Sequence, residues 1–304
     1  MNTDFVKYVV NPEKVYNEKY LELLNKISRF NAHENVLSGS YPIAGYKYDN
    51  DLLIIGREAP WWVGKFSVHE LDVKGAEEVF RERVNLPGAY AVRKACPMEF
   101  VKDLWGETKY RQLYNSSYNT KTDSFWVCAK EIVKGLGISC AGDDWASYLS
   151  LSYLYKISFA DINFLTEKLR LLQLEICKEL FKLELYMGRP RRILFLTGMK
   201  AAKDFLGLTE DVCPEDSIVN LGVFDYGIHR AETVVSANPK KYSKAELAEA
   251  VLRGFGVESG SVEHNLLWDK YRLLRGHNIS GSNGVRYCKF IGDEGGERMR
   301  RKCA

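Results

Sequence analysis

The chain has 304 residues, of which 46% are hydrophobic, 27% are charged and only 8 are prolines. This composition is typical of a globular protein, excludes a disordered, collagenous or disulfide-stapled chain, and allows one elaborated domain or two. No run of residues reaches the roughly 18 apolar positions of a membrane span, and the first residues lack the charged and apolar parts of a secretion signal. We therefore expect a cytoplasmic protein without a membrane partner.

Neither the seven cysteines nor the five histidines have the spacing of a metal site. No Cys-x-x-Cys pair is present, and the histidines show no His-x-x-x-His or His-x-Glu pattern. The sequence predicts buried thiols and no metal or other cofactor.

The positive charge is concentrated near the end of the chain. Residues 269–304 hold nine Lys and Arg against four Asp and Glu, a net charge of +5, whereas the whole chain has a formal charge of +3. Such a segment is compatible with contact to a polyanion, and it is equally compatible with simple solvation. We interpret residues 1–260 as a single domain and residues 261–304 as a basic C-terminal extension.

Apolar spacing predicts helices and buried strands in alternation. In chain order we expect a helix over 12–30, a strand over 52–55, a helix over 125–136, a helix or strand over 145–157, a long helix over 163–188, a strand over 193–196, a helix over 199–206, strands over 219–226 and 232–237, and a helix from 243. This alternation is typical of an α/β fold. We predict a central, mostly parallel sheet of about four strands flanked by helices, with an N-terminal helical extension.

The first candidate site follows the strand over 52–55, because ligands bind at the carboxyl ends of parallel strands. The loop there combines small, acidic and aromatic residues: Gly56, Glu58, Pro60, Trp61 and Trp62. Glu58 could orient or deprotonate a water molecule or stabilise a developing cation. The alternative is a glutamate in a surface turn.

The second candidate site follows the strand over 232–237. Asn238 could hydrogen-bond a planar base or an oxyanion, and Lys240, Lys241 and Ser243 could hold phosphate at a helix N-terminus. The alternative is a plain loop in which Ser243 caps the next helix.

Taken together, these segments resemble the uracil-DNA glycosylase superfamily. Its first motif, for example Gly-Glu-Ala-Pro-Gly, is similar to Gly56-Arg57-Glu58-Ala59-Pro60, which has one extra residue after the glycine. Its second motif, His-Pro-Ser or Asn-Pro-Ser, is similar to Asn238-Pro239-Lys240, and its Thr-Asn-x-x-Lys stretch corresponds to residues 152–156. The resemblance covers positions 51–254.

The resemblance implies a DNA glycosylase that flips a nucleotide out of the duplex and hydrolyses its N-glycosidic bond. Glu58 would stabilise the oxocarbenium-like sugar and position water, and Asn238 would hydrogen-bond the departing base. The base pocket would consist of Gly56, Ala59, Pro60, Trp61, Trp62, Tyr153 and Tyr155. The DNA phosphates would be held by Lys156, Lys240, Lys241 and Ser243. Because no lysine occupies an obvious Schiff-base position, we expect a monofunctional, monomeric enzyme that acts on double-stranded DNA and leaves an abasic site.

The base-reading positions depart from the superfamily pattern. Tyr153 corresponds to the usual Asn that reads uracil, and Ala59 corresponds to an Asp or Asn in several branches. These differences favour a modified pyrimidine, such as the glucosylated hydroxymethylcytosine of phage DNA that an anti-phage branch of the superfamily excises. Three alternatives stay open: a repair glycosylase for uracil or damaged bases, a catalytically inactive DNA-binding protein, and a nucleotide or nucleoside hydrolase.

Overall fold

The computed structural model describes residues 11–29, 36–58, 65–85, 101, 119–138, 144–159, 166–208, 218–226, 229–257, 273–280 and 286–291. Its helices are α1 (Pro12–Ser28), α2 (Val68–Lys74), α3 (Ala76–Val79), α7 (Ser124–Gly135), α8 (Thr166–Gly188), α9 (Met199–Leu206) and α10 (Lys244–Gly254), with a π-helical turn at Phe80–Val84 and 3-10 turns at Trp145–Tyr148 and Pro239–Lys241. Its strands are β1 (Val36–Gly39), β2 (Ile43–Ala44), β3 (Leu52–Glu58), β4 (Lys65–Ser67), β5 (Leu149–Tyr155), β6 (Ile157–Phe159), β7 (Arg192–Phe195), β8 (Ile218–Asp225), β9 (Arg230–Val235), β10 (Leu273–Ser280) and β11 (Arg286–Ile291).

The predicted α/β class is confirmed, but the predicted sheet of about four strands is too small. The main sheet has eight described strands in the order β11-β10-β8-β9-β7-β3-β5-β2 and is mixed. Four neighbouring strands, β9, β7, β3 and β5, run parallel, whereas the pairs β2–β5, β8–β9 and β10–β11 are antiparallel. The prediction missed the outer strands because β2 has only two residues and β10 and β11 lack a continuous apolar run.

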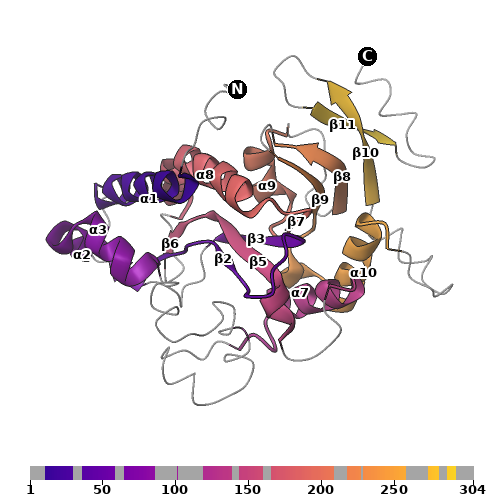
Figure 1. Ribbon diagram of the computed structural model, residues 1–304, viewed down its shortest axis with the longest axis horizontal. Coiled ribbons are helices and arrows are strands. Elements are labelled where there is room, and N and C mark those ends of the chain that lie inside the picture. Colours follow the sequence, from indigo (N-terminus) through magenta and orange to yellow (C-terminus); the bar gives the residue numbers. More distant parts are fainter. Residues whose placement is uncertain are drawn as a thin grey trace.

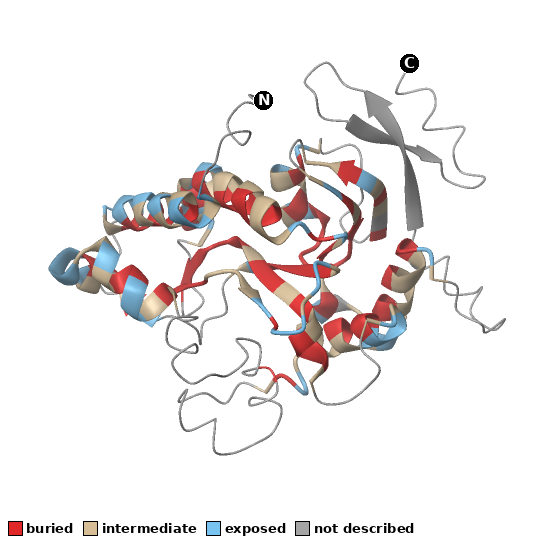
Figure 2. Ribbon diagram, in the orientation of Figure 1, coloured by how far each residue is buried: buried red, intermediate tan, exposed pale blue. Residues whose placement is uncertain are grey.

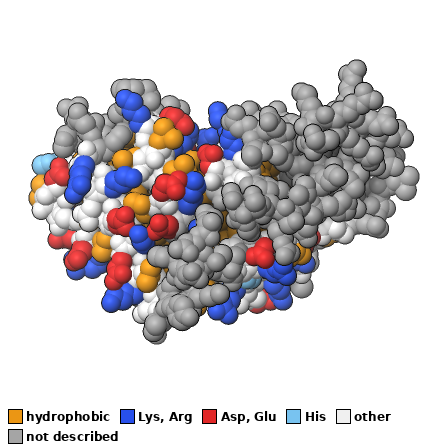
Figure 3. Space-filling model, turned by 90° about the horizontal axis from the view of Figure 1, so that it is seen from above, with side chains coloured by type: hydrophobic (Ala, Val, Ile, Leu, Met, Phe, Trp, Pro, Cys, Tyr) orange, Lys and Arg blue, Asp and Glu red, His pale blue; other side chains and the backbone are white. Residues whose placement is uncertain are grey.

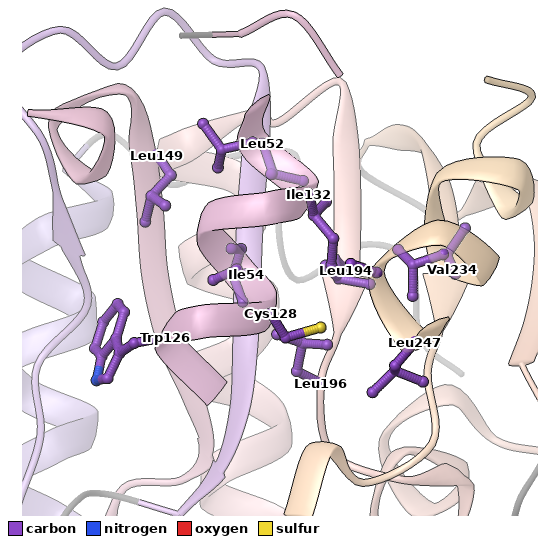
Figure 4. Packing of buried hydrophobic residues seen from close by; sticks show 14 of the residues in the cluster. Leu52, Ile54, Trp126, Cys128, Ile132, Leu149, Leu194, Leu196, Val234 and Leu247 are labelled. Atoms are coloured by element: carbon purple, nitrogen blue, oxygen red, sulfur yellow. The ribbon is translucent and has the colours of Figure 1, made fainter. Parts of the chain in front are cut away.

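Helices cover both faces of the main sheet, with α8 and α9 on one side and α7 and α10 on the other (Figure 1). The strands between these layers are the most buried part of the described chain (Figure 2). Leucine, isoleucine and valine side chains of the strands pack against Trp126, Cys128 and Ile132 of α7 and Leu247 of α10 (Figure 4). Strands that are buried on both faces have continuous apolar sequences. These central strands were therefore predictable from the sequence.

A smaller antiparallel sheet, in the order β4-β1-β6, packs with α1, α2 and α8 into a second apolar cluster. The chain passes from the main sheet to this one at Lys156, whose carbonyl accepts a hydrogen bond from the Ser40 amide at 2.9 Å. Residues 145–157, whose type was open, therefore form a 3-10 turn followed by one strand in each sheet.

The register of the parallel strands brings three chain segments to one edge of the main sheet. Ile55 of β3 pairs with Phe195 of β7, which pairs with Val235 of β9. Residues Glu58, Gly198 and Asn238 each follow this row by three positions. The ends of β3 and β9, distant in sequence, thus lie at the same carboxyl edge of the sheet, with β7 between them.

Strands β10 and β11 of the C-terminal segment extend the main sheet beyond β8. Strand β10 pairs in parallel with β8, and β11 pairs with β10. The division into a domain over residues 1–260 and an extension over 261–304 stays a prediction.

Candidate functional site

The candidate site lies at the carboxyl ends of β3, β7 and β9, with helix N-termini around it. Gly198 precedes α9 with φ 78°, and a Cβ atom added there would lie 3.8 Å from the Asn238 amide nitrogen. The Lys244 ammonium at the start of α10 donates to the Thr122 carbonyl at 3.3 Å, next to Asp123, the cap of α7. Helix N-termini attract negative charge, so this edge suits an anionic group.

Glu58 is the last residue of β3 and is held by an arginine of α8. Arg170 Nε donates to Glu58 Oε1 at 2.6 Å, and an Arg170 terminal nitrogen contacts the same oxygen. Arg57 Nε lies 3.5 Å from that oxygen. Both members of the Arg170–Glu58 pair are partly buried, with 22% and 21% of their side chains exposed. Glu58 is therefore a fixed, ion-paired carboxylate, not a loose surface residue.

Arg170 is itself held from two sides. Its second terminal nitrogen donates to Glu167 Oε2 at 3.0 Å. Burial acts to lower the pKa of Arg170, but the two carboxylates outweigh it and raise that pKa. Arg170 thus stays a cation in this position.

Gly56 of β3 and Tyr153 of the neighbouring strand β5 pack against each other. A Cβ atom added at Gly56 would lie 2.6 Å from two carbons of the Tyr153 ring, so the ring packs directly on the β3 backbone. Burial, together with the Asp123 carboxylate, raises the pKa of Tyr153 above its usual range. Tyr153 joins the cluster under α7, beside Phe125.

Tyr155 belongs to the opposite face of the sheet. It packs in the cluster under α8 and α9, with its ring centroid 5.4 Å from that of Phe205. Burial raises its pKa to about 12. The sequence placed Tyr153 and Tyr155 in one base pocket, but the structure separates the two rings into different apolar clusters.

Lys156 does not suit the phosphate contact that the sequence analysis assigned to it. Its side chain is 1% exposed and forms an ion pair with Glu184 Oε1 at 2.6 Å. It also donates to the Ser152 hydroxyl at 2.8 Å and to the Tyr153 carbonyl. This prediction is wrong because the side chain turns into the interior, where a carboxylate of α8 neutralises it.

Asn238 is fixed by its own loop. Its side-chain oxygen accepts a hydrogen bond from the Lys240 amide at 3.0 Å and so caps the 3-10 turn. Lys240 and Ser243 are exposed, and Ser243 occupies the cap position of α10, although its side chain makes no capping hydrogen bond. The side chain of Lys241 lies outside the described part of the structure.

Four predicted pocket residues, Ala59, Pro60, Trp61 and Trp62, lie outside the described residues. The structure packs Tyr153 on Gly56, places Glu58 and Asn238 at the carboxyl ends of β3 and β9 with β7 between them, and leaves these four untested.

Arg170 and Asp123 were not among the site residues predicted from the sequence. Gly198, by contrast, follows a buried strand and carries the signal of a strand-end glycine. Arg170 gave no such signal, because it is one of several charged residues on a long helix and its partner is 112 positions away.

The described part of the face in Figure 3 shows no concentration of basic side chains. On the face seen in Figure 3, acidic and basic side chains are interspersed over the described part. Among the described side chains, no group of three or more His, Cys, Asp or Glu residues is arranged to hold a metal ion. None of the described helices has both the length and the apolar character that crossing a membrane requires.

Comparison with protein-family models finds no match to this chain, and comparison with curated protein sequences finds none either.

Proposed function

We propose that the protein is a monofunctional DNA glycosylase that hydrolyses the N-glycosidic bond of a flipped-out modified pyrimidine and leaves an abasic site. One observation carries this proposal. Ile55 of β3, Phe195 of β7 and Val235 of β9 are paired side by side, and Glu58 and Asn238 each come three residues after their member of this row. Neighbouring strands are about 4.8 Å apart, so two strand spacings, about 10 Å, separate the ends that bear them. A nucleoside fits between a carboxylate and an amide at that separation.

The proposed chemistry divides the reaction between these two side chains. As the bond between the sugar C1′ and the base nitrogen breaks, the sugar becomes cationic and the base leaves with the electron pair. Glu58 directs a water molecule to C1′ and accepts its proton. The side-chain oxygen of Asn238 already accepts a hydrogen bond from the backbone amide of Lys240. The side-chain NH₂ of Asn238 is therefore the group that donates to the departing base.

The proposed substrate is a modified pyrimidine in double-stranded DNA, with glucosylated hydroxymethylcytosine as the first candidate. The Tyr153 ring on Gly56 supports a preference for a base other than uracil. A phenol has one hydroxyl, whereas the amide of an Asn at this position would have a carbonyl acceptor and an NH₂ donor. Lys240 and Ser243 are exposed at the same edge and would contact phosphates, which makes DNA binding dependent on salt. We place the reaction in the cytoplasm and in a monomer.

A catalytically inactive DNA-binding protein is the second candidate. The observation in its favour is the ion pair between Glu58 and Arg170, since a carboxylate whose charge is neutralised stabilises a cation less well. This alternative shares the DNA-binding surface of the first proposal and lacks the chemical step.

A base-release assay distinguishes the two candidates. DNA duplexes that contain uracil, hydroxymethyluracil, hydroxymethylcytosine or glucosylated hydroxymethylcytosine are incubated with the wild type, and abasic sites are measured. We expect release from one modified substrate. We further expect Glu58→Gln to lose that release by at least about 100-fold while its DNA affinity is kept. Salt-sensitive DNA binding without release from any duplex would contradict catalysis and support the binding protein.

A further inference from the structure

The contacts of Glu58 are made through one of its two oxygens. Arg170 Nε, an Arg170 terminal nitrogen and Arg57 Nε all approach Oε1. Among the described residues, Oε2 receives no hydrogen bond or ion pair. Within the described part of the chain, the carboxylate is therefore anchored through Oε1 and has no contact at Oε2.

We propose that Arg170 is a positioning residue that fixes Glu58 through Oε1 and leaves Oε2 to orient the attacking water molecule. This inference rests on the proposed glycosylase activity and deepens it, because it selects between two roles that the sequence leaves open for Glu58. In one role Glu58 positions water, and in the other its negative charge stabilises the cationic sugar.

The two roles respond to a neighbouring guanidinium in opposite ways. A positive group within hydrogen-bond distance offsets the carboxylate charge and weakens any attraction to the sugar cation. The same group holds the carboxylate in one rotamer, and correct orientation of a reacting water is a large part of catalytic rate. The Arg170 contact therefore favours the water-positioning role.

Arg170 stands on a helix that is well anchored for this task. Three residues further along α8, Gln173 accepts a hydrogen bond from the Ile157 amide at 3.0 Å and donates to the Ile157 carbonyl at 2.6 Å. Further along the helix, Glu184 forms the buried ion pair with Lys156 of the strand region. A rigid helix gives the guanidinium a defined place relative to β3.

The test compares Arg170→Met and Arg170→Lys with the matched control Arg192→Met, in steady-state base release from the DNA that the wild type acts on. Arg192 is likewise partly buried and paired with carboxylates of Asp51 and Glu232, but it lies at the amino end of β7. We expect Arg170→Met to lower kcat by about 10- to 100-fold with KM for DNA within about twofold. Arg170→Lys should recover part of kcat, because it restores charge but not the planar fork. Arg192→Met should stay within about twofold of the wild type.

A double variant shows whether Arg170 acts through Glu58. In the Glu58→Gln background, Arg170→Met should lower kcat by less than about twofold further, because the residue it positions is already gone. An equal loss in both backgrounds would overturn the inference, and so would a kcat for Arg170→Met at or above that of the wild type.

The remaining outcome separates this inference from the proposed function. If the wild type releases no base from any duplex, the proposed function is wrong and the positioning role is wrong with it. If the wild type is active and Arg170→Met matches it, only the positioning role is wrong. Melting temperatures of all variants identify any loss of kcat that comes from unfolding.

Discussion

At the scale of single residues, side chains at the strand ends are placed by what they pack against. Tyr153 can lie across β3 only because residue 56 has no side chain, and this contact sets where the phenol stands in the site. The absence of a side chain at Gly56 is thus a packing requirement, independent of any unusual backbone angle.

The replacement Gly56→Ala should therefore lower the free energy of unfolding. Its methyl group would meet the Tyr153 ring at 2.6 Å, and overpacking of this kind costs about 1–3 kcal/mol. Urea unfolding measures the effect. In the Tyr153→Ala background the same replacement should cost clearly less, because the obstructing ring is gone.

Gly188→Ala is the matched control, since a Cβ atom there meets its nearest neighbours at 4.0 Å. It should change the stability by no more than about 0.5 kcal/mol. Equal effects of the two alanine replacements would contradict the packing argument.

At the scale of elements, α8 ties the two sheets and α1 together through buried polar contacts. Glu184 of α8 pairs with Lys156 and accepts hydrogen bonds from Ser152 of β5 at 2.7 Å and from Tyr16 of α1 at 2.8 Å. Buried charges are tolerated when they are paired and hydrogen-bonded in this way. The network holds the helix that bears Arg170 against the strands that bear the site.

Removing one charge from this network should be costly. Lys156→Met leaves the Glu184 carboxylate buried without its counter-charge, and the loss of one partner of a buried pair typically costs about 3–5 kcal/mol. Chemical unfolding gives the value. Lys14→Met breaks the Lys14–Glu18 ion pair, whose side chains are 71% and 61% exposed, and should cost less than about 0.5 kcal/mol. A loss below about 1 kcal/mol for Lys156→Met would contradict the account.

The elements that the sequence predicted best are those whose apolar pattern is local. The helix over 199–206 and the strands around Gly56 and Val235 were found from such patterns. Strand β2 was not found, since it has two residues and exists through its pairing with β5. The type of residues 145–157 was open for the same reason, because strand pairing decides it.

The site was predictable where it follows from strand order and unpredictable where it follows from side-chain packing. Glu58 and Asn238 lie at the same edge because parallel strands end there. The burial of Lys156, the separation of Tyr153 from Tyr155 and the pairing of Arg170 with Glu58 depend on contacts between distant parts of the chain.

At the scale of the whole molecule, the described core buries groups that ionise at high pH. Burial raises the pKa of Cys128 and Cys177 to about 12 and raises the pKa of Tyr16 and Tyr20 well above the usual tyrosine value. In the unfolded chain the thiols ionise near pH 8.5, so above about pH 9 the unfolded state loses protons that the folded state keeps.

Stability should accordingly be complete at about pH 7 and fall as the pH rises from about 9 toward 12. Urea unfolding at successive pH values measures this decline. The double variant Cys128→Ala with Cys177→Ala should decline less steeply than the wild type, because two of the raised groups are absent. An unchanged urea midpoint between about pH 7 and pH 11 would contradict the expected sign.

The central claim is that the carboxyl edge of β3 and β9 hydrolyses an N-glycosidic bond, with Glu58 as the water-positioning carboxylate. The most direct test is single-turnover base release from glucosylated hydroxymethylcytosine DNA by the wild type, Glu58→Gln and Glu232→Gln. Glu232 is the control because it is also partly buried and paired with an arginine, at the opposite edge of the sheet. We predict release by the wild type and Glu232→Gln and a loss of at least about 100-fold in Glu58→Gln. Equal release by all three proteins would contradict the claim.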